Sequence, residues 1–162
     1  MILKAMTDAS IVTQVPFART FTVAWEHLDS NGHMANTAYL NLAVTTRMMF
    51  FQASGFAMQE FAKQRFGPVV RRDEIEYFRE LRLLDPVRVT LTLAGMSTDG
   101  SHFRLRNEFF RSDGKSAAVV TTTGGWLDLA ERRLTTPPAA IVRAFEGLVR
   151  TEDFAELKSS VK

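Results

Sequence analysis

Residues 25–54 read WEHLDSNGHMANTAYLNLAVTTRMMFFQAS, and this stretch decides the fold. Its first part gathers acids, bases and hydrogen-bonding groups into a short turn, namely Glu26, His27, Asp29, Ser30, Asn31, His33 and Asn36. A core strand could not bury so many polar groups without loss. Residues 38–51 are then apolar at too many angles for a surface helix with one apolar face. The pattern predicts a polar loop followed by a helix that is covered nearly all round.

The flanks of this stretch set its boundaries. Residues 17–26 alternate and are rich in Val, Thr and aromatic side chains, which predicts a strand leading into the loop. In the loop, Gly32 permits the left-handed backbone of a tight reversal, and Asn36 is a candidate N-cap. The helix is expected to run to about Ser54, where Gly55 can end it.

The second half of the chain is predicted to be mainly β. Residues 57–66 indicate a short helix, and four long β segments follow at residues 68–81, 86–97, 101–111 and 116–129. Asp99-Gly100 and Asp113-Gly114 lie between alternating runs, so the last three segments should form an antiparallel meander. This order of elements predicts an α+β fold, with an antiparallel sheet of about five strands wrapped around one long central helix.

Length and composition indicate one domain over residues 1–162, with a loose N-terminal arm at 1–15 and a C-terminal helical tail at 139–162. The net charge is +2 and the cations are scattered, which argues against a nucleic-acid partner. No stretch is long enough to span a membrane, and no secretory signal is evident. The chain has no cysteine, which suits a cytoplasmic protein.

The sequence LDSNGHMANTAYL resembles the signature of hotdog-fold acyl-CoA thioesterases of the 4-hydroxybenzoyl-CoA thioesterase type. The residues that carry the resemblance are Asp29, Gly32, His33, Asn36 and Tyr39. Residues 67–89, GPVVRRDEIEYFRELRLLDPVRV, are similar to the family's second strand and the start of its third, so the likeness covers roughly residues 17–138. His27 and Ala35 depart from the family pattern.

The resemblance implies hydrolysis of a coenzyme A thioester to a free acid and CoA. Asp29 would be the nucleophile or the general base, and a backbone N–H near Asn36 would bind the oxyanion at the helix start. Gly32, His33 and Tyr39 would help to position the substrate.

Further expectations concern the substrate handle and the assembly. Arg71 and Arg72 are candidates for contacts with the coenzyme phosphates, with solvation or pairing to Asp73 and Glu74 as the alternative. Neither a metal nor a cofactor is required, since coenzyme A belongs to the substrate. A homodimer or homotetramer is expected from the uncovered edge and outer face of the sheet, and the resemblance implies that each site lies between two subunits.

Other interpretations stay open from the sequence. Asp29 could be an ordinary turn aspartate, and His33 could be a spacer that orders the turn through hydrogen bonds. His27, Asp29 and His33 could also together form a metal site. A hotdog enoyl-CoA hydratase is an alternative function, although DSNGHM lacks the Pro of the hydratase motif and places its His one position early. A noncatalytic module that binds acyl-CoA or an acyl carrier is a second alternative. The acyl group itself is not predicted.

Overall fold

The computed structural model describes residues 14–161, so the predicted arm at residues 1–15 falls almost wholly outside the described residues. In chain order the elements are β1 (Phe17–Thr22), a 3-10 helix (Trp25–His27), α1 (Asn36–Ala53), α2 (Met58–Gln64), β2 (Phe66–Tyr77), β3 (Pro86–Ser97), β4 (His102–Phe110), β5 (Ser116–Asp128), β6 (Arg133–Thr135), α3 (Ala139–Glu146) and β7 (Arg150–Leu157).

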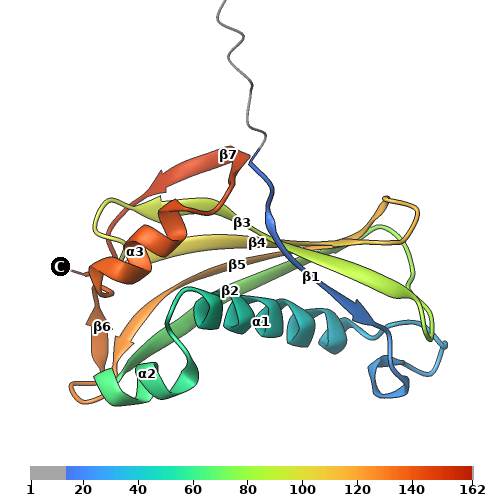
Figure 1. Cartoon of the computed structure of the whole chain (residues 1–162), viewed down its shortest axis with the longest axis horizontal. Coiled ribbons are helices and arrows are strands. Elements are labelled where there is room, and N and C mark those ends of the chain that lie inside the picture. Colours follow the sequence, from blue (N-terminus) through green and yellow to red (C-terminus); the bar gives the residue numbers. More distant parts are fainter. Residues whose placement is uncertain (1–13, 162) are drawn as a thin grey trace, which may run out of the picture.

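Within residues 14–161, a single sheet of seven strands forms the body of the molecule, and it curls over α1 (Figure 1). The main path is β1-β3-β4-β5-β2, with β6 added to β5 and β7 added to β3. Strands β3, β4 and β5 form the predicted antiparallel meander. Gly100 and Gly114, at its two turns, have φ of 69° and 77°, a conformation that glycine adopts without strain. The predicted α+β hotdog architecture is therefore confirmed.

Both predicted boundaries before α1 need correction. Strand β1 ends at Thr22, because the Ala24 N–H donates to Nδ1 of His27 over 2.9 Å and closes a local turn in place of sheet pairing. The N-cap of α1 is Ala35, which makes no side-chain cap, so the expectation that Asn36 caps the helix is wrong. Asn36 is instead the first helical residue.

The predicted helical tail holds for α3 and is wrong beyond Glu146, because residues 150–157 form β7, which pairs in parallel with β3. Strand β1 covers only the first half of β3, so the second half has an edge that β7 fills. A side chain at Gly95 would lie 2.8 Å from the Ala155 carbonyl oxygen, so this close approach requires glycine. Sheet pairing overrides the local helical tendency of the tail.

Helix α1 is buried on one side and open on the other. Val44 and Met49 are 42% and 37% exposed, so the expectation that the helix is covered nearly all round is wrong within one subunit. The buried side meets two different cores. Mainly small and aliphatic residues, together with Tyr39 and Phe109, surround its N-terminal half. A larger aromatic cluster centred on Phe51 and Trp126 joins its C-terminal half to α2 and α3. No helix in residues 14–161 has the length and apolarity to cross a membrane.

Candidate active site

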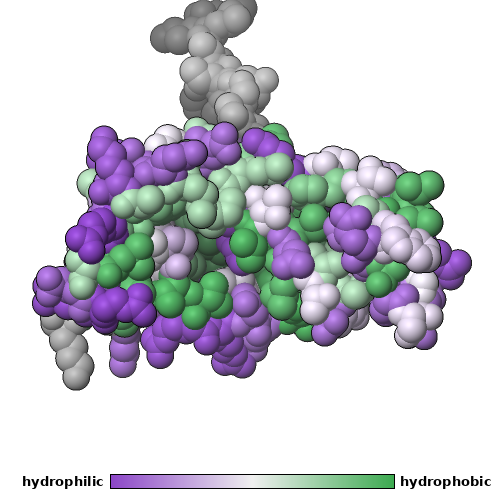
Figure 2. Space-filling model, turned by 90° about the horizontal axis from the view of Figure 1, so that it is seen from below, coloured by the Kyte–Doolittle hydropathy of each residue, from purple (hydrophilic) through white to green (hydrophobic). Residues whose placement is uncertain are grey.

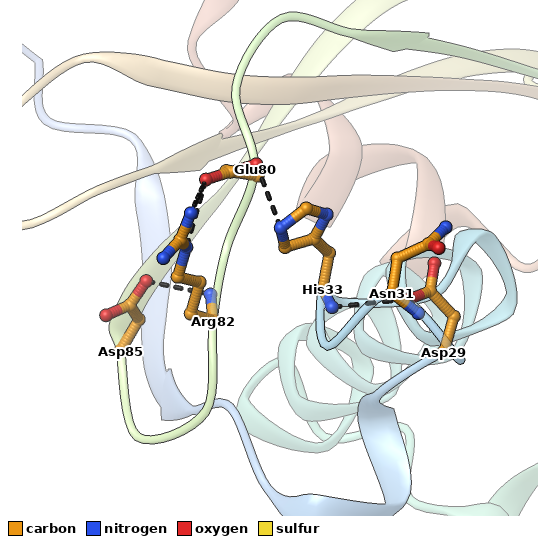
Figure 3. A network of polar contacts seen from close by, with 6 residues as sticks. All are labelled: Asp29, Asn31, His33, Glu80, Arg82 and Asp85. Atoms are coloured by element: carbon orange, nitrogen blue, oxygen red, sulfur yellow. Dashed lines mark hydrogen bonds and ion pairs between the residues drawn. The ribbon is translucent and has the colours of Figure 1, made fainter.

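Asp29 lies in the loop that joins the 3-10 helix to α1, at an exposed position (Figure 3). Its Oδ1 accepts hydrogen bonds from the backbone N–H groups of Asn31, at 2.8 Å, and His33, at 3.2 Å. Gly32 has φ of 74°, and its N–H donates to the Asp29 carbonyl oxygen over 3.1 Å. Within residues 14–161, Oδ2 accepts no hydrogen bond. The turn therefore fixes one carboxylate oxygen and leaves the other open to solvent.

His33 points to a neighbouring loop (Figure 3). Its Nε2 lies 3.0 Å from Oε2 of Glu80, and Glu80 also accepts a hydrogen bond from Nε of Arg82 at 2.9 Å. The hydrogen bond from Arg82 is the main cause that lowers the pKa of Glu80, and the positive charges of Arg82 and Arg111 add to it. The Met34 N–H donates to the Leu81 carbonyl oxygen over 2.8 Å. These contacts join the two loops, as expected of a spacer, while a role for His33 in positioning substrate stays a prediction.

The start of α1 adjoins the Asp29 turn. An isolated bridge pairs Leu28 with Met34, and the Ala35 N–H donates to the His27 carbonyl oxygen over 2.8 Å. The helix then begins at Asn36, which is exposed. Backbone N–H groups in the first turn of a helix have no intrahelical acceptor, and the helix dipole makes this end partly positive. The loop thus places an anchored carboxylate beside a helix start that can bind an oxyanion.

Tyr39 is a core residue one turn into α1. Its ring packs edge to face on Tyr77, with centroids 5.4 Å apart, and on Phe109, at 5.2 Å. Burial, together with the nearby Tyr77, raises the pKa of Tyr39 to about 12. The phenol is therefore neutral at physiological pH and holds α1 against β2 and β4. Its predicted role toward the substrate stays a prediction.

Arg71 and Arg72 lie in the middle of β2 and are both exposed. Nη2 of Arg72 is 2.6 Å from Oε1 of Glu74, and Arg72 lines a hollow of about 600 Å³ together with Arg104 and Arg106. Tyr77 ends β2 five residues later, roughly 17 Å away at the usual rise of a strand. The chain meets the loop of Asp29 only beyond Tyr77, at Glu80 and Leu81, so within one subunit the arginine pair is separated from that loop by the second half of the strand.

The proposed metal ligands do not converge. His27 accepts the hydrogen bond from Ala24 through Nδ1, and His33 faces Glu80. Across residues 14–161, no three His, Asp or Glu side chains are grouped so that they could hold a metal ion.

Arg47 is a charged residue that the sequence reasoning missed. It lies on α1, is only 5% exposed, and donates from Nη1 to Oγ1 of Thr122 over 2.5 Å. Thr122 donates in turn to Oδ1 of Asp73 over 2.5 Å. Burial lowers the pKa of Arg47, and the charge of Asp73 opposes that shift. A lone arginine in the otherwise uncharged stretch 38–51 was the available signal.

Beside Arg47 is a pocket of about 210 Å³ between α1 and the sheet, whose other lining residues are Val44, Met48, Phe51, Pro68, Val70, Phe103, Leu105 and Thr122. Viewed from the side on which α1 lies, the surface has a hollow bordered by apolar side chains (Figure 2). The pocket therefore combines an apolar wall with one buried cation.

The sequence matches the thioesterase-like superfamily over residues 23–145. No curated protein matches it at a significant level. Among solved structures, a hypothetical protein from Staphylococcus aureus in complex with CoA is 20% identical, with a TM-score of 0.76 over 92% of this chain and 97% of the other.

Two further structures are similar. A 1,4-dihydroxy-2-naphthoyl-CoA thioesterase from Synechocystis is 16% identical, with a TM-score of 0.73 over 81% of this chain and 96% of the other. A putative thioesterase from Pseudomonas aeruginosa is 24% identical, with a TM-score of 0.71 over 81% and 98% of the two chains. At these identities the likeness establishes the fold.

Proposed function

The chain belongs to the thioesterase-like superfamily, and from this membership we propose that it hydrolyses an acyl-CoA thioester to a free acid and CoA. The observation that carries the proposal is the Asp29 carboxylate, which two backbone N–H groups hold at the start of α1. The structural likeness to a CoA complex and to a CoA thioesterase supports coenzyme A as the thiol carrier.

The chemistry follows from the geometry of the turn. The open Oδ2 of Asp29 either attacks the thioester carbon, giving an anhydride that water then hydrolyses, or takes a proton from an attacking water. In both routes the C–S bond breaks and CoA leaves as the thiol. The carbonyl oxygen gains negative charge as the bond forms, and the first backbone N–H groups of α1, at Asn36 and Thr37, would stabilise it. Preorganised donors of this kind contribute most in a site that excludes water.

The edge strand β2 supports assembly with a second copy of the chain. It is the last strand of the main sheet path, it is 12 residues long, and Val70 on it is 47% exposed. An open edge of this length invites pairing with another strand. We therefore propose a homodimer, or a tetramer built from two such dimers, in which β2 pairs with its counterpart across a two-fold axis.

This pairing would also complete the site. Helix α1 runs opposite to β2, since Tyr39 packs on Tyr77 while the pocket beside Arg47 includes Pro68 and Val70. Arg47 is about 16 Å along α1 from Asn36 at 1.5 Å per residue. An antiparallel pairing of β2 about its midpoint would bring the Asp29 end of one subunit opposite the pocket of its partner. The thioester would then be cleaved at one subunit while its acyl group enters the other.

The function is tested by incubating the protein with a panel of acyl-CoA esters and measuring the release of free thiol. We expect turnover of at least one ester, together with a dimer or tetramer in sedimentation at micromolar concentration. Hydration of an enoyl-CoA with every thioester inert would replace the proposal with a hydratase. Tight binding of acyl-CoA without any turnover would indicate a binding module.

A further inference from the structure

Resting on the proposed function, we propose that Arg47 selects acyl groups that carry an anionic oxygen, such as a carboxylate, at the end distant from the thioester. The substrate class would then be ω-carboxyacyl-CoA, in preference to plain alkanoyl-CoA of the same length. Three features of the fold around this guanidinium support the proposal.

The first observation is that the charge of Arg47 is poorly matched. A guanidinium has five N–H donors, and within residues 14–161 Arg47 makes one hydrogen bond, to the neutral hydroxyl of Thr122. The countercharge that acts on Arg47 is Asp73, which is reached through that hydroxyl, and the ion pairs within residues 14–161 include none between the two. The other Arg47 nitrogens are not among the fully buried atoms that lack a hydrogen-bond partner, so they keep some accessible surface and can meet a ligand that supplies an anion.

The second observation is the pocket beside the guanidinium. Val44, Met48 and Phe51 from α1 form one wall, and Pro68 and Val70 from β2 contribute to the facing wall. These walls suit methylene groups and offer them no hydrogen bonds. A methylene group takes up about as much space as a water molecule, roughly 30 Å³, so a volume of 210 Å³ holds about seven such groups. The pocket thus fits a short acyl group with a polar end.

The third observation is a bulge that creates the arrangement. The pairing of β2 with β5 shifts register between Val70 and Arg72. Before the bulge, Pro68 and Val70 line the pocket. In a regular strand the next residues on that face would be Arg72 and Glu74. After the bulge it is Asp73 that faces inward and accepts the hydrogen bond from Thr122. Arg72 and Glu74 instead line the hollow that includes Arg104 and Arg106. The bulge therefore keeps the other charges of β2 out of the pocket, and among the residues that the structure describes Arg47 is the one charged residue in its lining.

The competing explanation is that Arg47 is only structural and fixes α1 to β5 and β2 through Thr122 and Asp73. The two explanations differ in what they predict for substrate preference. A structural residue affects all acyl groups alike, whereas a selecting residue changes the ratio between charged and neutral ones.

The experiment compares kcat/KM for glutaryl-CoA and pentanoyl-CoA, which have equal chain length, in the wild type and in Arg47→Met. We expect the wild type to prefer glutaryl-CoA by at least about tenfold, and the substitution to lower that ratio by about 100-fold. Asp73→Asn should raise the ratio, because the competing carboxylate is gone. The opposite directions of the two variants are not expected of a structural contact.

Equilibrium binding of the two esters, measured by calorimetry, separates this inference from the proposed function. If no ester is hydrolysed, thioesterase activity is excluded, while a binding preference for glutaryl-CoA that Arg47→Met abolishes still supports selection by Arg47. If Arg47→Met does not fold, Asp73→Asn tests the role of Arg47 instead, because it should raise the ratio of kcat/KM for glutaryl-CoA to that for pentanoyl-CoA. Hydrolysis with no preference for glutaryl-CoA, or a ratio that neither variant changes, would overturn the role of Arg47 and leave the proposed function standing.

Discussion

The Asp29 turn and the Arg47 pocket hold charge in opposite ways along one helix. Asp29 is exposed, and backbone N–H groups from its own turn hold its carboxylate. Arg47 is almost fully buried, and its partners come from β5 and β2, far away in the sequence. The difference indicates separate uses. A carboxylate that stays solvated in the free protein is available for chemistry, whereas a buried cation is suited to recognising a ligand.

The largest expected effect comes from Asp29→Asn. The amide oxygen can still accept the hydrogen bonds from Asn31 and His33, so the free energy of unfolding should change by less than about 1 kcal/mol. The negative charge is lost, and the barrier to thioester cleavage should rise by about 3 to 6 kcal/mol. Thiol release and thermal melting measure the two quantities.

Asp113→Asn is the matched control for this variant. Asp113 is also an exposed turn aspartate, and its Oδ1 accepts from the Lys115 N–H over 3.0 Å, but it lies in the hairpin between β4 and β5. It should show a similarly small change in stability and full turnover. An active but destabilised Asp29→Asn variant would reduce Asp29 to a turn residue and remove the contrast with Arg47.

A smaller effect is expected from Thr122→Val, which removes the hydroxyl that Arg47 and Asp73 share. A buried donor then loses its partner, and the free energy of unfolding should fall by about 1 to 3 kcal/mol. Thr123→Val is the control, since the side chain of Thr123 faces the hollow on the other side of the sheet. Chemical denaturation of both variants measures the difference. Equal free energies of unfolding for Thr122→Val and Thr123→Val would show that the burial of Arg47 does not depend on the Thr122 hydroxyl.

The smallest effect concerns Tyr39, between the two regions. Its pKa is raised to about 12, so the folded state keeps the phenolic proton that the unfolded state loses near pH 10. The raised pKa of Tyr39 therefore adds on the order of 1 to 2 kcal/mol to the free energy of unfolding below pH 10, and this contribution is lost as the pH rises toward 12. Melting temperatures between pH 9 and 11.5 should fall less steeply in Tyr39→Phe. Parallel curves for the two proteins would show that burial does not perturb this phenol.

The two regions also differ in how far the sequence predicted them. The Asp29 turn followed from local chemistry, because Gly32 and the neighbouring polar residues satisfy one another within a few positions. The meander was predicted for the same reason, from its two Asp-Gly turns. Sequence patterns failed in two places for different reasons. The strand predicted through residue 26 ends at Thr22, because a local turn between Ala24 and His27 replaces sheet pairing. The tail predicted to be helical forms β7, because a distant partner, the free half of β3, pairs with it.

By itself the sequence determined the fold class, the order of the main helices and strands, and the loop that carries the candidate acid. Each of these rests on short-range periodicity or on turn chemistry, which a sequence displays directly. Only the tertiary structure showed that Arg47 is buried in a pocket beside Thr122 and Asp73, and that one side of α1 and the edge of β2 are open. The reason is physical: the burial of a charge depends on which strands pack around it, and a single bulge in β2 decides which side chains turn inward.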